Sequence, residues 1–183
     1  MKISLIASKL SAASLACILT ASTAGAAPSP QVFRATLDIT ETVVPMATKT
    51  CYAIGTIAAL GWATYLDAVT GISQDCINTQ GTGSFVFSSL QPLTLLSLKG
   101  NLFVCYRGSF VQESTGGVVY LIDGVYRIIG GTVTFQGARG SGVMQGNEDL
   151  SAVLIGRGHV MLNGEITYGA IPAGQNEPDC SLL

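Results

Sequence analysis

The segment YRIIGGTVTFQGARGSG, residues 126–142, is the most informative part of the sequence. Its glycines separate short runs of β-branched and aromatic residues, which predicts a strand, a glycine-rich turn, a short strand and a glycine-rich bend. We expect the chain to reverse at Gly130-Gly131, with a positive φ at Gly131. A nucleotide-binding glycine loop leads directly into a helix, whereas residues 142–146 lead into more strand and turn. The segment therefore argues against phosphate binding.

Strand and turn signals continue on both sides of this segment. In residues 32–44, Phe33 and Leu37 share one face while Arg34 and Asp38 share the other, the period of a half-buried strand with a cross-strand ion pair on its outer side. Further strands are expected at 51–59, 62–69, 84–88, 93–98, 102–111, 118–129 and 153–167, with turns at Leu60-Gly61, Lys99-Gly100-Asn101 and Asp123-Gly124. Such spacing predicts an all-β fold, a single antiparallel β-barrel of about eight strands, with an irregular β-sandwich as the alternative.

The composition excludes several classes of protein. The 183 residues contain 9 Lys and Arg against 11 Asp and Glu, and 48% of them are hydrophobic. A disordered chain is more charged and less apolar, and a nucleic-acid-binding protein carries basic clusters that are absent here. One histidine cannot build a multi-histidine zinc site. We expect neither a metal nor another cofactor. The length suits one domain, residues 27–183.

The N-terminal residues 1–26 have the pattern of a cleaved secretory signal peptide. Lys2 and Lys9 supply the positive charge, residues 10–19 the apolar stretch, and Ala24-Gly25-Ala26 the small-residue cleavage site, with cleavage after Ala26. The apolar stretch is short for an uncleaved anchor, and the residues before Cys17 fit a lipoprotein site poorly. We therefore predict a secreted or periplasmic protein with no membrane span in the mature chain.

Four cysteines remain once the signal peptide and its Cys17 are removed: Cys51, Cys76, Cys105 and Cys180. An even number of cysteines in an exported chain favours two disulfides, and their spacing lacks the paired pattern of a zinc ribbon. Four cysteines allow three connectivities, among which the sequence does not choose. A crosslink to Cys180 would hold the polar tail at residues 175–179.

Residues 130–142 resemble the glycine-rich signature GGTGxFxGAxGxG of small barrels of the allene oxide cyclase and dirigent type, which many secreted bacterial proteins also carry. The matching residues are Gly130-Gly131-Thr132, Phe135, Gly137-Ala138 and Gly140, while Val133 stands where a third glycine is usual. Leu60-Gly61-Trp62 and residues 93–106 also look like earlier strands of such proteins. The resemblance implies a barrel cavity that holds a hydrophobic small molecule, and association into homo-oligomers.

Candidate catalytic residues lie in the last predicted strand. Arg157, His159 and Glu165 alternate onto one face, where they would line a cavity with His159 as proton carrier. The alternative is a solvated strand face with a ladder of charges. Trp62, Tyr126 and Phe135 are candidate ligand-pocket walls, and Phe135 is placed to plug the barrel or its mouth. The Glu148-Asp149 pair falls in a predicted loop and indicates turn chemistry rather than catalysis.

The sequence leaves three functions open. The first is an exported barrel that binds or shapes a small apolar molecule. The second is a cyclase or isomerase of a secondary metabolite, and the third is a non-catalytic structural or interaction module. A closed apolar cavity with two or three convergent polar groups would favour the first two, and a barrel filled by its own side chains would favour the third.

Overall fold

Eight antiparallel strands form a closed barrel in the part of the chain that the structure describes. The computed structural model describes residues 28–46, 50–81, 83–112, 117–152 and 154–169, together with residue 180; the predicted signal peptide and the polar tail at 175–179 lie outside these ranges. The elements in chain order are β1 (Gln31–Pro45), β2 (Ala53–Ala63), β3 (Asp67–Gly81), β4 (Ser84–Ser97), β5 (Gly100–Gln112), β6 (Val118–Gly131), the 3₁₀-helix η1 (Val133–Phe135), β7 (Arg139–Ala152) and β8 (Ile155–Thr167). The predicted fold class is confirmed.

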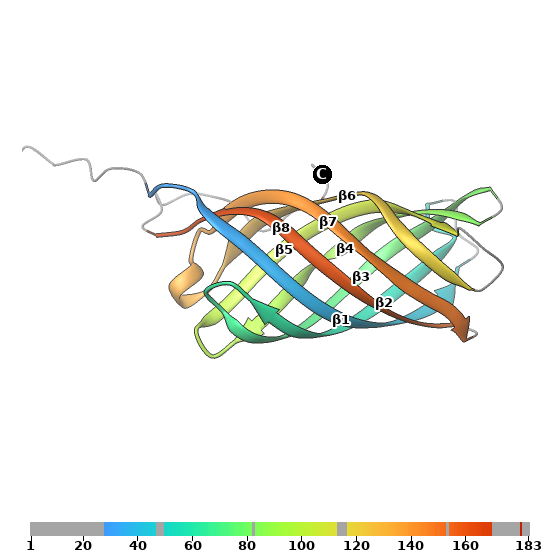
Figure 1. The fold of residues 1–183 in the computed structure, drawn as a ribbon, viewed down its shortest axis with the longest axis horizontal. Coiled ribbons are helices and arrows are strands. Elements are labelled where there is room, and N and C mark those ends of the chain that lie inside the picture. The colour runs from blue at the N-terminus through green and yellow to red at the C-terminus, as the bar shows by residue number, and fades with distance from the viewer. Residues whose placement is uncertain are drawn as a thin grey trace, which may run out of the picture.

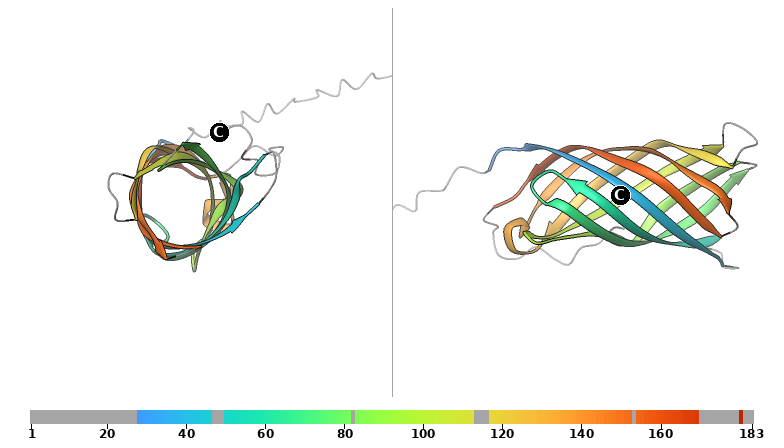
Figure 2. Two further views of the ribbon diagram at one scale, coloured as in Figure 1. Left: turned by 90° about the vertical axis from the view of Figure 1, so that its right-hand side faces the viewer. Right: turned by 60° about the horizontal axis from the view of Figure 1, so that its bottom comes forward.

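The barrel closes because the first strand pairs with the last. Each strand pairs with its neighbour in sequence, and β1 also pairs with β8, with Leu37 opposite Gly61 on β2 and Val160 on β8. Figure 1 shows the strands running obliquely around the long axis, and the left view of Figure 2 looks along that axis. Closure leaves no unpaired sheet edge among the described strands.

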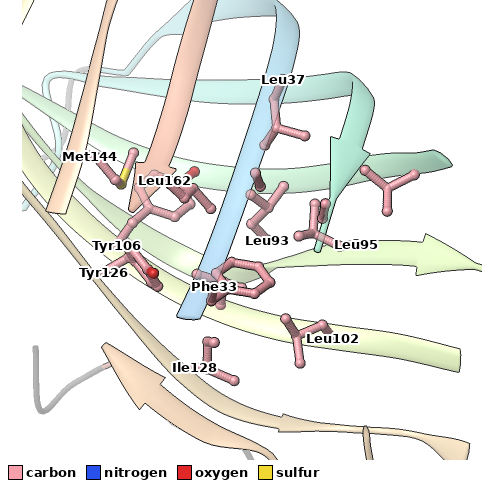
Figure 3. Packing of buried hydrophobic residues seen from close by; sticks show 14 of the residues in the cluster. Phe33, Leu37, Leu93, Leu95, Leu102, Tyr106, Tyr126, Ile128, Met144 and Leu162 are labelled. Carbon is pink, nitrogen blue, oxygen red and sulfur yellow. The ribbon is translucent and has the colours of Figure 1, made fainter. Parts of the chain in front are cut away.

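The hydrophobic core lies inside the barrel. Along β1, Phe33, Ala35 and Leu37 are buried and the residues between them are exposed, as the period of two predicted. Side chains from all eight strands join them in one buried cluster, part of which Figure 3 shows. At the end of the barrel where η1 links β6 to β7, Leu102, Phe135 and Ile166 are fully buried, so this end is filled by side chains.

Two predicted turns are in fact parts of continuous strands. The chain passes through Leu60-Gly61 without turning, and β2 ends only at Ala63. A side chain at position 61 would collide with the carbonyl of Thr36 on β1, so the glycine allows close strand approach rather than a turn. Asp123-Gly124 is a bulge within β6, where Asp123 has a φ of 52° and the pairing with β5 and β7 shifts register.

The glycine-rich segment also differs from its prediction. The expected short strand after Gly131 is the 3₁₀-helix η1. Gly131 is absent from the residues with positive φ, and a side chain there would instead crowd the Asn101 carbonyl and Phe135. The positive φ falls on Val133, at 53°, and on Gly137, at 65°. A β-branched residue in this conformation is strained.

Replacing Val133 by glycine is expected to stabilise the protein. The side chain is 79% exposed, so little packing is lost, and relief of the left-handed strain outweighs the added freedom of the unfolded chain by about 1 kcal/mol. Chemical denaturation of the Val133→Gly variant measures the change. The matched control is Val143→Gly in the extended strand β7, which should lose about 1 kcal/mol. A loss in both variants would contradict the strain at Val133.

Two disulfides join the four cysteines in one of the three possible connectivities. Cys51 is bonded to Cys76 and Cys105 to Cys180, each pair with 5.3 Å between the Cα atoms. The second bond holds Cys180 against strand β5 in the middle of the chain. In the described ranges, no helix is both long and apolar enough to cross a membrane.

Candidate functional site

Three carboxyl side chains lie inside the barrel among the hydrophobic residues. Glu41 on β1, Asp75 on β3 and Glu148 on β7 are 5%, 3% and 2% exposed. Glu41 continues the inward-facing series of Phe33, Leu37 and Ile39, so it is buried because the strand's alternation carries it into the core. We call these three residues the carboxyl cluster.

Glycines on the intervening strands make the space for the carboxyl cluster. Gly55 on β2 lies between β1 and β3, and a Cβ there would overlap both Glu41 Oε1 and Asp75 Oδ1. Gly156 on β8 lies between β7 and β1, and a Cβ there would overlap Glu148 Oε1. The carboxyl oxygens therefore rest directly on the barrel wall, where any other residue would displace them.

Each carboxyl of the cluster has one buried oxygen without a hydrogen-bond partner. These atoms are Glu41 Oε1, Asp75 Oδ1 and Glu148 Oε1. Glu41 is hydrogen-bonded to both Asp75 and Glu148 within the cluster. A buried unpaired acceptor costs free energy, so the cluster carries spare hydrogen-bonding capacity that the fold itself does not use.

Burial keeps two of these carboxyls, Asp75 and Glu148, protonated near neutral pH. Desolvation, followed by the negative charge of Glu41, raises the pKa of Asp75 to about 9. The same two causes raise the pKa of Glu148 to about 9. Burial also raises the pKa of Glu41, although hydrogen bonds from Glu148 and Asp75 oppose the increase. At pH 7 Asp75 and Glu148 are therefore neutral carboxylic acids, which donate hydrogen bonds.

Two interior cavities meet at the carboxyl cluster. The larger, about 120 Å³, extends past Phe85 and Ala53 to Tyr52, whose side chain is exposed at the barrel end opposite η1. The smaller, about 40 Å³, lies deeper and is lined mostly by aliphatic side chains, with Tyr106 beside them. Both are lined by the same five residues: Glu41, Asp75, Glu148, Phe87 and Phe110.

Tyr106 forms a second polar group at the deeper cavity. Its hydroxyl donates to Ser73 Oγ at 2.9 Å, and Ser73 in turn donates to the Gln91 carbonyl at 2.9 Å. Burial and the nearby Asp75 raise the pKa of Tyr106 well above its usual value. Tyr106 is therefore a neutral hydrogen-bonding group on the cavity wall.

The three predicted catalytic residues share the outer face of β8. Arg157 and Glu165 are exposed, and His159 Nδ1 contacts Asp38 Oδ1 across the strands at 3.0 Å. A pair across two strands is what the outer face of residues 32–44 predicted, with Asp38 as the acidic member. None of the three lines either interior cavity. A chemical role for them stays a prediction, and it would concern the outer surface of the barrel.

The three predicted pocket residues are divided between the two faces. Trp62 is 51% exposed on the outside of β2. Tyr126 and Phe135 are buried in the interior, near the end closed by η1, and neither lines the two cavities. The Tyr126 hydroxyl is buried without a partner, and burial, with a smaller effect of Glu165, raises its pKa to about 12.

The sequence pattern missed the carboxyl cluster. Glu148 was expected in a loop, but residues 139–152 form strand β7 and turn Glu148 inward. Residues 71–80 were not recognised as strand, although they carry Asp75 into the core. In the described residues, no group of three or more His, Cys, Asp or Glu is arranged to hold a metal ion.

Comparison with known proteins adds only a distant likeness. No family model matches the sequence, and no curated protein matches it. Among solved structures, the chain is similar to the pterocarpan synthase dirigent protein GePTS1, with 13% identity and a TM-score of 0.43 over 84% of this chain and 94% of that chain. At this distance the likeness concerns the fold alone, and no site or activity is transferred from it.

Proposed function

We propose that this protein is an exported β-barrel that binds or shapes a small apolar molecule in its interior. The observation that carries the proposal is the pair of apolar cavities that meet at three buried carboxyls with spare oxygens. Ligand sites typically combine an apolar lining with a few convergent polar groups. A barrel kept only for its fold would fill this space with side chains.

The chemistry of the carboxyl cluster also suits a cyclase or isomerase. A carboxylic acid that stays protonated at neutral pH donates a proton or a hydrogen bond to a bound carbonyl or epoxide oxygen. The enclosed wall would meanwhile restrict the conformations of the substrate. We also propose that the chain is a member of the allene oxide cyclase and dirigent superfamily, on the basis of the glycine-rich residues 130–142.

Export is supported by the cysteines. Disulfides persist in oxidising compartments, and both bonds use only cysteines outside the predicted signal peptide. We therefore propose a location outside the cytoplasm and cleavage after Ala26. N-terminal sequencing of the mature protein tests the cleavage site.

A non-catalytic interaction module is the second candidate function. Leu60, Trp62 and Ile72 expose apolar side chains on the outer faces of β2 and β3, and an apolar surface of this kind suits self-association. Sedimentation of the purified protein tests it. A monomer at micromolar concentration would count against this candidate.

Filling the larger cavity is expected to abolish retention of the ligand. Native mass spectrometry of protein purified from its own source should reveal a co-purified small molecule. Ala53 is buried on the cavity wall, so Ala53→Leu should reduce occupancy at least about tenfold, because the added carbons occupy the binding space.

The control variant makes the same change on the opposite face of the same strand. Ala58 is exposed on the outside of β2, so Ala58→Leu should leave occupancy unchanged. Retention of the molecule by both variants, or its absence from the native protein, would count against a ligand site in the barrel.

A further inference from the structure

We propose that the carboxyl cluster binds the ammonium group of a small apolar amine. This inference rests on the proposed function, because it assigns the polar end of the same ligand. The cluster and the cavities around it supply the acceptors, the aromatic faces and the dimensions that such a molecule requires.

The interior has acidic groups but no basic group beside them in the described residues. Neither cavity is lined by Lys, Arg or His. Lys99 pairs with Asp67 at 2.7 Å, and the described arginines other than the half-buried Arg139 are exposed. The Arg139 guanidinium donates hydrogen bonds to the backbone carbonyls of Ile129 and Ala138. A buried charge is retained at low cost only when it is paired, so a cationic ligand would complete this site.

The spare acceptors match the donors of a primary ammonium in number. Glu41, Asp75 and Glu148 each keep one oxygen free of hydrogen bonds, and an alkylammonium group has three N–H donors. Two of the three oxygens, those of Glu41 and Asp75, meet over Gly55. A neutral ligand with a single hydroxyl or carbonyl would leave most of this capacity unused.

Aromatic rings surround the same cavities. Phe87 and Phe110 line both of them with ring centroids 5.0 Å apart, and Phe85 lines the larger. Ring faces attract cations and also pack against apolar groups. The ammonium would lie against the carboxyls while the apolar body of the ligand lies between these rings.

The size of the cavities limits the ligand. A buried apolar cavity of about 150 Å³ holds one benzene molecule. The larger cavity is about 120 Å³ and reaches the exposed Tyr52. The expected ligand class is therefore an amine with one ring or a short alkyl chain, and a larger body would have to extend past Tyr52.

Binding of an ammonium is expected to release a proton from Asp75 or Glu148, because the added positive charge favours their ionised forms. The titratable groups that face the bound nitrogen are the carboxyls of β1, β3 and β7 and the Tyr106 hydroxyl of β5. The other strands contribute no titratable group there: β2 and β8 contribute glycines, β4 contributes Phe87 and β6 contributes Leu121. The ammonium keeps its proton, and Asp75 or Glu148 passes its own proton to solvent and becomes the carboxylate partner. Affinity should therefore rise about tenfold per pH unit from pH 6 to 8.

Calorimetry with benzylamine and benzyl alcohol tests the proposal. Benzylamine is cationic at pH 7, and benzyl alcohol is its neutral counterpart of nearly equal size. We expect benzylamine to bind at least tenfold more tightly. Titrations in phosphate and Tris, which differ in ionisation enthalpy, should show about one proton released per benzylamine and none per benzyl alcohol.

The Glu148→Gln variant tests the role of the cluster. Gln keeps the shape of the protonated acid but cannot ionise, so affinity for benzylamine should fall at least tenfold while that for benzyl alcohol changes less than twofold. Asp75→Asn repeats the test on another strand, and the pH dependence of the unmodified protein needs no variant.

The outcomes separate this inference from the proposed function. Equal or tighter binding of benzyl alcohol, or benzylamine binding without proton release, overturns the amine site and leaves the apolar ligand site standing. Failure of both compounds to bind overturns the inference together with the function on which it rests.

Discussion

Raising the pH from 5 to 8 is expected to destabilise the protein by at least about 1.4 kcal/mol per pH unit. The folded state keeps protons on Asp75 and Glu148 up to a pKa of about 9, whereas the unfolded chain releases them near the ordinary values of 3.8 and 4.5. Their contribution to stability is therefore complete below about pH 4 and is lost as the pH rises to about 9. Thermal unfolding across this range measures the slope.

Replacing Asp75 or Glu148 by the corresponding amide should remove much of the dependence of stability on pH. Asp75→Asn and Glu148→Gln stay neutral in both states, so each should flatten the slope and raise the free energy of unfolding at pH 8 relative to the unmodified protein. Asp149→Asn is the matched control, since Asp149 is exposed on the outer side of the same strand as Glu148. If the stability of Asp149→Asn depended on pH as weakly as that of Asp75→Asn, the pH dependence would arise outside the carboxyl cluster.

Loss of the Cys105–Cys180 disulfide is expected to have the second large effect. The bond spans 75 residues and restricts the unfolded chain. Its removal should therefore lower the free energy of unfolding by about 4 kcal/mol. Cys105 lies fully buried on β5, in a strand whose inward positions are held by Val104 and Tyr106. Chemical denaturation of the Cys105→Ser/Cys180→Ser double variant measures the loss.

The other disulfide provides the comparison. Cys51–Cys76 spans 25 residues, so its removal should cost about 1 kcal/mol less than removal of Cys105–Cys180. A larger loss from Cys51–Cys76 would contradict the dependence on loop length. Thiol titration of the unfolded mature protein should find no free sulfhydryl from these four cysteines, and four reactive groups would contradict both bonds.

The strand alternation in β1 could be predicted from the sequence, and with it the barrel interior. Phe33, Leu37 and Ile39 share the inward face, and the same parity places Glu41 there too. The alternation alone does not predict a glutamate in a core, because ionised carboxyls are rarely buried. Only the glycines on neighbouring strands, which are adjacent in space but not in sequence, explain how the core accommodates it.

Asp75 and Glu148 could not be placed because their local sequences favour turns. Residues 73–79 are mostly polar, and Gly146-Asn147 precedes Glu148. Pairing with neighbouring strands overrides these preferences, which is common in sheets. The predicted alternation of Arg157, His159 and Glu165 was correct, but periodicity does not say which face is inside. The face with Gly156 and Val160 is inside because it alone is small and apolar enough to pack there.

Pairing of β1 with β8 also limits when the protein can fold. Asp38 and His159, which meet across this seam, are 121 residues apart in the chain. Because this one seam joins strands from the two ends of the barrel domain, the ring cannot be completed before the last strand has left the ribosome. Until β8 is available, β1 keeps an unpaired edge, which is exposed to pairing with another chain.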